Sequence, residues 1–253
     1  MGINNYNLFC DDFYIDMYIN TEIDLVFQRD TILAFFERIQ KNFGSMCCFY
    51  RRQNNEYCLE DDRESSQYRW VALETERLGS GFVNPASFED AYSLDKLILE
   101  IAPYMLSLSH LDVDSLDVVF AMDFDYRGNH DELIAEALFS TTAFNSLLDI
   151  PGSRPIGFSP ALVVALSEDC RTQARISIDS KTSVFDPEKQ KQSEDESITL
   201  SFTIRQYPPV IEKFDLLKSF EYQCGLLEEL MAEKIIPNFA KPLSEAIAQK
   251  GLK

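Results

Sequence analysis

An internal repeat is the feature that most constrains the fold of this chain. At an offset of 101 residues, residues 15–34 (IDMYINTEIDLVFQRDTILA) align without a gap with residues 116–135 (LDVVFAMDFDYRGNHDELIA). Both segments change at the same point from an apolar period of two to a period of 3.6, which is the pattern of a strand followed by a helix. The chain is therefore predicted to contain two related halves, residues 1–110 and 111–253, that together form one domain.

Each half is predicted to run strand, helix, three strands, helix. In the first half these are a strand over 13–19, a helix from its cap Asp30 to about Asn42, strands over 46–51, 56–60 and 68–78, and a helix opened by a capping box at Ser87. In the second half they are a strand over 116–126, a helix over 131–139 behind an Asn129–Glu132 capping pair, strands over 161–166, 171–183 and 197–207, and a helix over 212–249. The Gly79-Ser80-Gly81 segment is predicted to be a turn that ends a strand. Two I-x-P motifs, ending at Pro103 and Pro237, are predicted to mark equivalent helix ends.

This order of elements predicts an α+β fold. Each half would place its helices on one face of an antiparallel sheet, and two halves joined edge to edge would give a pseudo-twofold cradle with an open face. In element order, the chain resembles the duplicated folds of TATA-box-binding proteins and of gyrase-inhibitor-like ligand-binding domains. That resemblance implies a binding surface and does not supply a function.

Charge and cysteine content narrow the classes of partner. The chain has 42 acidic and 23 basic residues, a net charge of −19, so its field repels phosphate and we expect neither nucleic acid nor an anionic membrane as a partner. The six cysteines have no C-x-x-C spacing, which indicates neither a zinc site nor a disulfide framework. With no secretion signal and no long apolar segment visible, we expect a cytoplasmic protein. The chain has no phosphate-cradling glycine loop, and we expect no cofactor. These patterns do not determine the oligomeric state.

An acidic cluster that recurs in both copies is the strongest candidate site. Strand parity places its members opposite the apolar residues, on a face that could bind a metal cation, an amine or a basic peptide. Aromatic side chains beside carboxylates would suit an organic cation. The cluster comprises Asp16, Glu22 and Asp24 in the first copy and Asp117, Asp123 and Asp125 in the second, and the predicted ligand-binding set is Tyr14, Asp16, Tyr18, Asp117, Asp123, Asp125, Arg175 and Arg205.

A simpler interpretation explains the same residues without a ligand. Polar residues are common on a solvent-exposed strand face. Arg175, Asp179, Thr203 and Arg205 are expected to share this face with the carboxylates, so cross-strand ion pairs could explain the charges. The two histidines, His110 and His130, make at most a weak metal motif, and His130 is expected to be solvated in a helix cap. No motif for a serine or cysteine nucleophile is present.

Three function classes follow. The first is a binding or interaction protein that uses the open sheet face for a small-molecule or protein ligand; the alternatives are a carboxylate-based metal-dependent hydrolase and a structural or assembly subunit. An enzyme would need a group with a shifted pKa in a closed pocket, whereas an assembly subunit would leave an apolar sheet edge or helix stripe exposed. The charged segment Asp186–Ser197 is expected to be a mobile hairpin tip.

Overall fold

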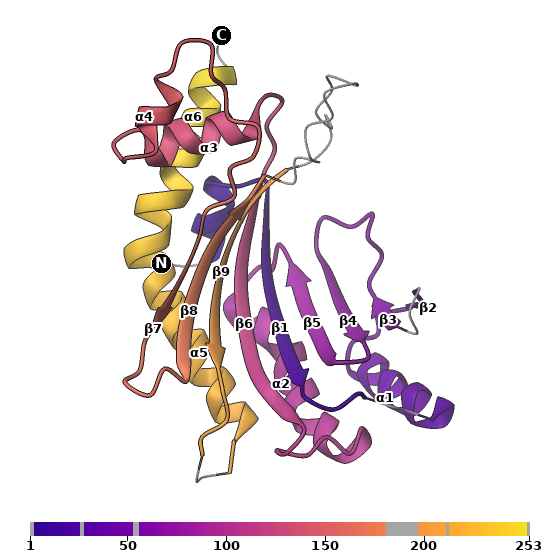
Figure 1. Cartoon of the computed structure of the whole chain (residues 1–253). Helices are drawn as coiled ribbons and strands as arrows, with labels where there is room; N and C mark the ends of the chain where they lie inside the picture. Colours follow the sequence, from indigo (N-terminus) through magenta and orange to yellow (C-terminus); the bar gives the residue numbers. More distant parts are fainter. Residues whose placement is uncertain (1–2, 26–27, 53–55, 181–196, 211–212, 252–253) are drawn as a thin grey trace.

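The computed structural model describes residues 3–25, 28–52, 56–180, 197–210 and 213–251. Nine of its segments are strands of one sheet, and helices cover one face of that sheet (Figure 1). The strands are β1 (Asp12–Thr21), β2 (Cys48–Arg51), β3 (Tyr57–Glu60), β4 (Tyr68–Leu73), β5 (Arg77–Val83), β6 (Val113–Phe124), β7 (Ala161–Ala165), β8 (Thr172–Asp179) and β9 (Ile198–Gln206). The helices are α1 (Arg29–Asn42), α2 (Phe88–Met105), α3 (His130–Phe139), α4 (Asn145–Leu148), α5 (Leu216–Leu230) and α6 (Lys241–Gly251), with a 3-10 turn η1 (Ile3–Leu8) and a π-helical segment η3 (Met231–Ala240).

All strand pairs are antiparallel, in the order β2-β3-β4-β5-β1-β6-β9-β8-β7. The first strands of the two predicted halves, β1 and β6, are neighbours at the centre, and each has the last strand of its own half on its other side. One sheet therefore contains strands from both halves, and the predicted α+β class with an antiparallel sheet is confirmed.

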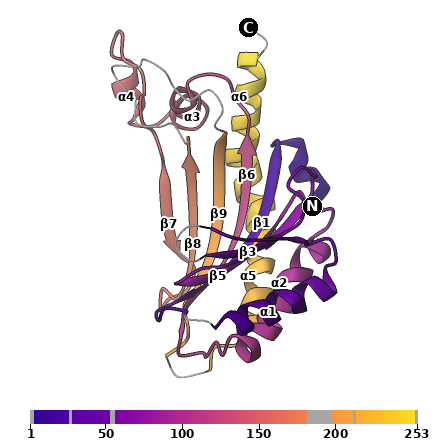
Figure 2. The same ribbon diagram turned by 90° about the vertical axis from the view of Figure 1, so that its right-hand side faces the viewer.

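Strand parity decides which face of the sheet is buried. In β1 the odd residues Phe13, Ile15, Met17 and Ile19 are fully buried, and in β6 the even residues from Leu116 to Phe124 are buried, as the alternation predicts. These side chains join one hydrophobic core with residues of α1, α2, α3 and α5. Figure 1 shows α1, α2 and α5 behind the sheet, and the turned view in Figure 2 places them on one side of it, so the opposite face of β1 and β6 carries no helix of the described chain.

Two helix starts were predicted correctly from their capping residues. The Ser87 side chain accepts a hydrogen bond from the Asp90 N–H at 3.1 Å, and the Asn129 side chain accepts one from the Glu132 N–H at 3.0 Å. The predicted cap at Asp30 is wrong, because α1 begins at Arg29 and its N-cap residue, Gln28, makes no side-chain cap bond. Asp30 lies instead in the first turn, where an acidic side chain interacts favourably with the helix dipole.

Other predicted elements differ in detail. The segment predicted as one strand over 68–78 forms β4 and the start of β5, so the first half has four strands after its helix, and Gly79-Ser80-Gly81 lies inside β5 instead of in a turn. Pro237 does not end a helix: it lies within η3, and α6 continues to Gly251. A proline lacks the N–H that an α-helix needs, and a π-helical segment is one way to continue past it. The predicted hairpin tip lies, apart from its last residue, outside the described residues.

Candidate functional site

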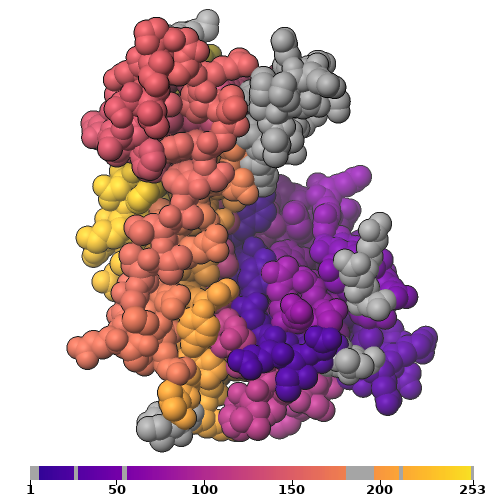
Figure 3. Space-filling view, viewed as in Figure 1, coloured from indigo at the N-terminus to yellow at the C-terminus, as the bar shows by residue number. Residues whose placement is uncertain are grey.

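The open face of the sheet brings together most of the predicted site residues. Register pairs Tyr18 with Asp117 and Asp117 with Arg205, so these three form one row across β1, β6 and β9. Asp16 begins a second row that runs through Val119 and Thr203 to Arg175. Tyr14 and Asp123 lie one and two rows further along the same face. Figure 3 shows this face from the front, with β1 running between the two parts of the sheet.

Three predicted acidic residues are not on this face. Asp125 lies beyond the last residue of β6, at the end of the sheet, where its N–H donates to an Asp11 carboxylate oxygen at 2.7 Å. Glu22 and Asp24 follow the end of β1 and are exposed in the loop. The assumption of a single strand over both copies of the cluster is therefore wrong, because the register with β6 shifts at Thr21 and the strand stops there.

Asp117 is held by a cross-strand ion pair. The Arg205 guanidinium donates two hydrogen bonds to its oxygens, at 2.7 and 2.6 Å, and the Asn20 amide donates a third at 3.2 Å. The Asp117 side chain is 8% exposed and that of Arg205 is 41% exposed. The hydrogen bonds that Arg205 donates to Asp117 raise the pKa of the arginine, against the effect of its burial. This pair fits the simpler interpretation, in which ion pairing within the sheet explains the charges.

Asp123 is also satisfied within the protein. It accepts hydrogen bonds from the Tyr14 hydroxyl at 3.0 Å and from the Thr199 hydroxyl. Burial, followed by the charge of Asp123, raises the pKa of Tyr14, so the phenol stays a hydrogen-bond donor. Tyr14 and Asp123 therefore form a link between β1 and β6, the two central strands.

Asp16 differs from these carboxylates because it has no ion pair with any described residue. Its Oδ1 atom is shielded from solvent and accepts no hydrogen bond from a described residue. Burial raises the pKa of Asp16 to about 7, and the nearby charge of Asp95 adds to the rise, while the indole of Trp70 and the hydroxyl of Tyr18 offset part of it. A carboxyl group in this state can change its protonation near neutral pH.

Two glycines of β5 leave the space that the Asp16 carboxyl group and its neighbouring rings occupy. A Cβ at Gly81 would collide with Asp16 Oδ1 and lie 2.6 Å from Trp70 Nε1, and one at Gly79 would lie 3.0 Å from the Tyr18 ring and 3.2 Å from the Trp70 ring. The glycines therefore let the carboxyl group and both rings lie directly on the sheet. The ring centroids of Tyr18 and Trp70 are 6.0 Å apart. We call Asp16, Tyr18, Trp70, Gly79 and Gly81 the Asp16 cluster.

The sequence reasoning missed Trp70 and both glycines of the Asp16 cluster. The available signal was their spacing, since Gly79 and Gly81 lie two residues apart and thus on the same face of one strand. The prediction of a turn at Gly79-Ser80-Gly81 was incompatible with this spacing along a strand. Trp70 pairs with Gly81 across β4 and β5, and this contact follows from register alone. No pattern within residues 68–73 indicates which strand will lie beside them.

His130 is buried, which corrects the expectation that it is solvated. It is 3% exposed, and its two ring nitrogens lie 2.9 Å from the Ser180 carbonyl oxygen and 2.8 Å from the Tyr126 carbonyl oxygen. Its place at the start of α3 lets the ring tie that helix to the end of β8. His130 therefore has a structural explanation that does not involve a ligand.

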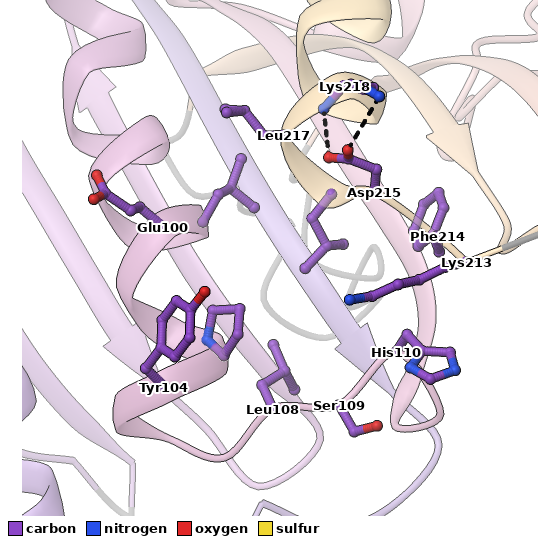
Figure 4. A pocket seen from close by; sticks show the side chains of 13 residues that line it. Glu100, Tyr104, Leu108, Ser109, His110, Lys213, Phe214, Asp215, Leu217 and Lys218 are labelled. Atoms are coloured by element: carbon purple, nitrogen blue, oxygen red, sulfur yellow. Dashed lines mark hydrogen bonds and ion pairs between the residues drawn. The ribbon is translucent and has the colours of Figure 1, made fainter.

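A separate pocket lies on the other side of the molecule, between the end of α2 and the start of α5 (Figure 4). It has a volume of about 660 Å³, and its walls include Tyr104, Leu108 and Leu217. The Lys213 ammonium points into it, and the nearby Lys218 pairs with Asp215 at 3.6 Å. None of the predicted site residues lines this pocket.

Comparison with known proteins adds no family to these observations: no protein-family model and no curated protein sequence matches the chain. Within the described residues, no three His, Cys, Asp or Glu side chains lie close enough together to hold a metal ion. All six cysteines are free. None of the described helices combines the length and apolar character that crossing a bilayer requires.

Proposed function

We propose that the chain is a binding protein whose open sheet face takes a cationic nitrogen group, with Asp16 as its charged contact. One observation carries this proposal. Asp117 and Asp123 have partners within the protein, whereas Asp16 lies beside the side chains of Tyr18 and Trp70 and has no cationic partner among the described residues. An ammonium or guanidinium group would supply the missing charge.

The surroundings of Asp16 suit such a group. Aromatic faces attract cations by about 0.5–2 kcal/mol, depending on how far the cation is desolvated. Tyr18 already accepts a contact of this kind inside the protein, because the Arg77 guanidinium lies 4.9 Å from its ring centroid. A bound cation would favour the charged form of Asp16, so binding would release a proton wherever the free carboxyl group is protonated. Affinity should then rise with pH up to the pKa of Asp16.

The duplication with pseudo-twofold symmetry is part of this proposal. The order of strands outward from the centre supports it: β5, β4, β3 and β2 follow β1, and β9, β8 and β7 follow β6, so the first three strands on each side correspond. Met17 and Val118, equivalent at the offset of 101 residues, are also register partners near the centre of the sheet. The equivalent of Asp16 is Asp117, which Arg205 neutralises. In this scheme only the first half kept a free carboxylate.

The hydrolase alternative draws no support from the described residues, which hold no cluster of metal-ligating side chains. Asp16 has the shifted pKa that an enzyme would need, but it lies on the sheet face that no helix of the described chain covers. We therefore favour binding over catalysis. A cytoplasmic location remains part of the proposal.

The test uses the single tryptophan of the chain, which is Trp70. Because its ring lies beside Asp16, its fluorescence should report occupation of the Asp16 cluster. The probes are tetramethylammonium, a primary alkylamine and an arginine-rich peptide, titrated at pH 6, 7 and 8. The first two represent small cations and the third represents a basic protein surface, so the result distinguishes the two sources of the cation.

We expect Asp16→Asn to weaken binding by at least about 10-fold, a loss of roughly 1.4 kcal/mol for the charged contact. Asp30→Asn is the matched control, because it removes the same charge from a side chain that is 95% exposed on α1. For the unaltered chain, affinity should rise about tenfold per pH unit below 7 and level off above it. Binding that Asp16→Asn leaves unchanged, or that lacks this pH dependence, would contradict the proposal.

A further inference from the structure

The edge strand β7 has backbone groups that no described residue binds. It pairs with β8 on one side and ends the sheet on the other. At the two ends of the β7–β8 pair, the Ile178 N–H donates to the Pro160 carbonyl and the Leu166 N–H donates to the Thr172 carbonyl. Even-numbered residues thus direct their backbone groups toward β8. By alternation, Ala161, Val163 and Ala165 direct theirs away from the sheet.

This edge lacks the protection that natural edge strands use against pairing with another chain. Such strands are blunted by charges, prolines or bulges. At the opposite end of the sheet, β2 ends in Arg51 and is followed by Arg52. In β7 (ALVVA) every residue is exposed and none is charged. Pro160 lies just before β7, but its backbone groups are directed toward β8, where its carbonyl accepts the hydrogen bond from Ile178. It therefore does not block the outer edge.

The surroundings of β7 are also apolar. Leu162 is 60% exposed and Val163 is 54% exposed, so neither face of the strand is covered. Of the large hydrophobic side chains exposed in the described residues, half lie between Phe144 and Leu166. Figures 1 and 2 both place α4 beside the start of β7, which extends the apolar surface beyond the strand.

Charge indicates what covers this surface. The chain carries a net charge of −19, yet residues 140–166 contain one acidic residue, Asp149, and one basic residue, Arg154. Two copies of the chain repel each other over most of their surface, and a neutral segment is where they can meet. A basic partner, in contrast, would be attracted by the acidic parts of the molecule and would gain nothing at this edge.

We propose that β7 is the interface of a homodimer, in which β7 of a second copy pairs with it antiparallel about a twofold axis at Val163. The strand is complementary to itself in this arrangement. Val163 pairs with its own copy and Ala161 with Ala165 of the second copy, so the outward backbone groups of all three residues are satisfied. Leu162 then faces Val164 of the second copy on the helix side, and the two sheets become one.

The area that a stable dimer needs explains the role of the neighbouring segment. A specific interface buries about 800 Å² on each partner, which is more than a five-residue strand supplies. In the antiparallel arrangement, the start of one β7 lies beside the end of the other. The apolar side chains Phe144 and Leu147 of one copy would therefore approach Leu166 of the second copy and enlarge the contact.

The test measures the oligomeric state of the full chain by sedimentation velocity between about 1 and 100 µM at about 0.15 M salt, where the Debye length is about 8 Å. Val163→Pro is the decisive variant. The Val163 N–H faces away from β8, so proline should cost no bond within the protein while it blocks the central pair of the dimer. Val163→Thr is the matched control, because it keeps the N–H and the β-branched shape.

We expect the unaltered chain and Val163→Thr to dimerise and Val163→Pro to raise the dimer dissociation constant by at least about 10-fold, given roughly 0.5–1.5 kcal/mol for each lost hydrogen bond. Leu162→Lys alters only a side chain and should also raise the dimer dissociation constant. It replaces Val163→Pro as the test if the proline variant fails to fold. A chain that is monomeric throughout this range overturns the proposal, even if it captures a different protein. Dimers that persist in both Val163→Pro and Leu162→Lys overturn it as well.

Discussion

Asp95 allows a quantitative prediction about how stability depends on pH. It lies on α2, is 1% exposed, and accepts a hydrogen bond from the Ser80 hydroxyl at 2.6 Å, while its Oδ2 has no hydrogen-bond partner among the described residues. Burial raises its pKa to about 7, against the opposing effect of that hydrogen bond. Ser80 lies between Gly79 and Gly81 in β5, so its side chain bonds Asp95 on one side of the strand while Asp16 packs over Gly81 on the other side.

The direction of the effect follows from linkage. An aspartate in an unfolded chain has a pKa near 3.9, so between about pH 4 and 7 the folded state holds a proton on Asp95 that the unfolded state has lost. The free energy of unfolding should therefore fall as pH rises through this window and level off above it. A shift of about three pKa units corresponds to about 4 kcal/mol at pH 8, since each unit is worth 1.36 kcal/mol.

Asp95→Asn keeps an acceptor for Ser80 and removes the charge. We expect it to raise the free energy of unfolding by up to about 4 kcal/mol at pH 8 and to change it little at pH 4. Urea denaturation followed by Trp70 fluorescence at five pH values between 4 and 8 measures the difference. Asp30→Asn, on an exposed side chain, is the control and should give the same small difference at every pH. A loss of stability from Asp95→Asn that is equal at all pH values would refute the reasoning.

Two further substitutions test the open face. Asp117→Asn should lower the free energy of unfolding by about 1–3 kcal/mol, because it weakens two charged hydrogen bonds from Arg205 at a side chain that is 8% exposed, and it should leave cation binding in place. Equal stability in urea denaturation would count against a structural ion pair. Gly81→Ala should cost about 1–3 kcal/mol and shift the Trp70 emission, because the new methyl group would displace Asp16 and the indole. An unchanged emission spectrum would show that the ring does not rest on Gly81.

The sequence alone predicted much of the local structure. Alternation placed Phe13 to Ile19 and Leu116 to Phe124 on buried faces, because a strand exposes its two faces with a period of two wherever one face is covered. The caps at Ser87 and Asn129 were predictable for a similar reason, since a capping bond spans only three residues. Both kinds of signal are local, so strand faces and helix caps can be predicted without knowing which strand lies alongside.

The tertiary structure decided which polar residues have a charged partner and which do not. Asp16 and Asp117 align at the offset of 101 residues of the predicted repeat, yet β9 brings Arg205 to Asp117 while β4 and β5 bring Trp70 and Gly81 to Asp16. The exposure of β7 likewise depends on its position at the end of the sheet, because its apolar sequence would equally suit a buried strand. Register and strand order arise from long-range pairing, so no local pattern of residues contains them.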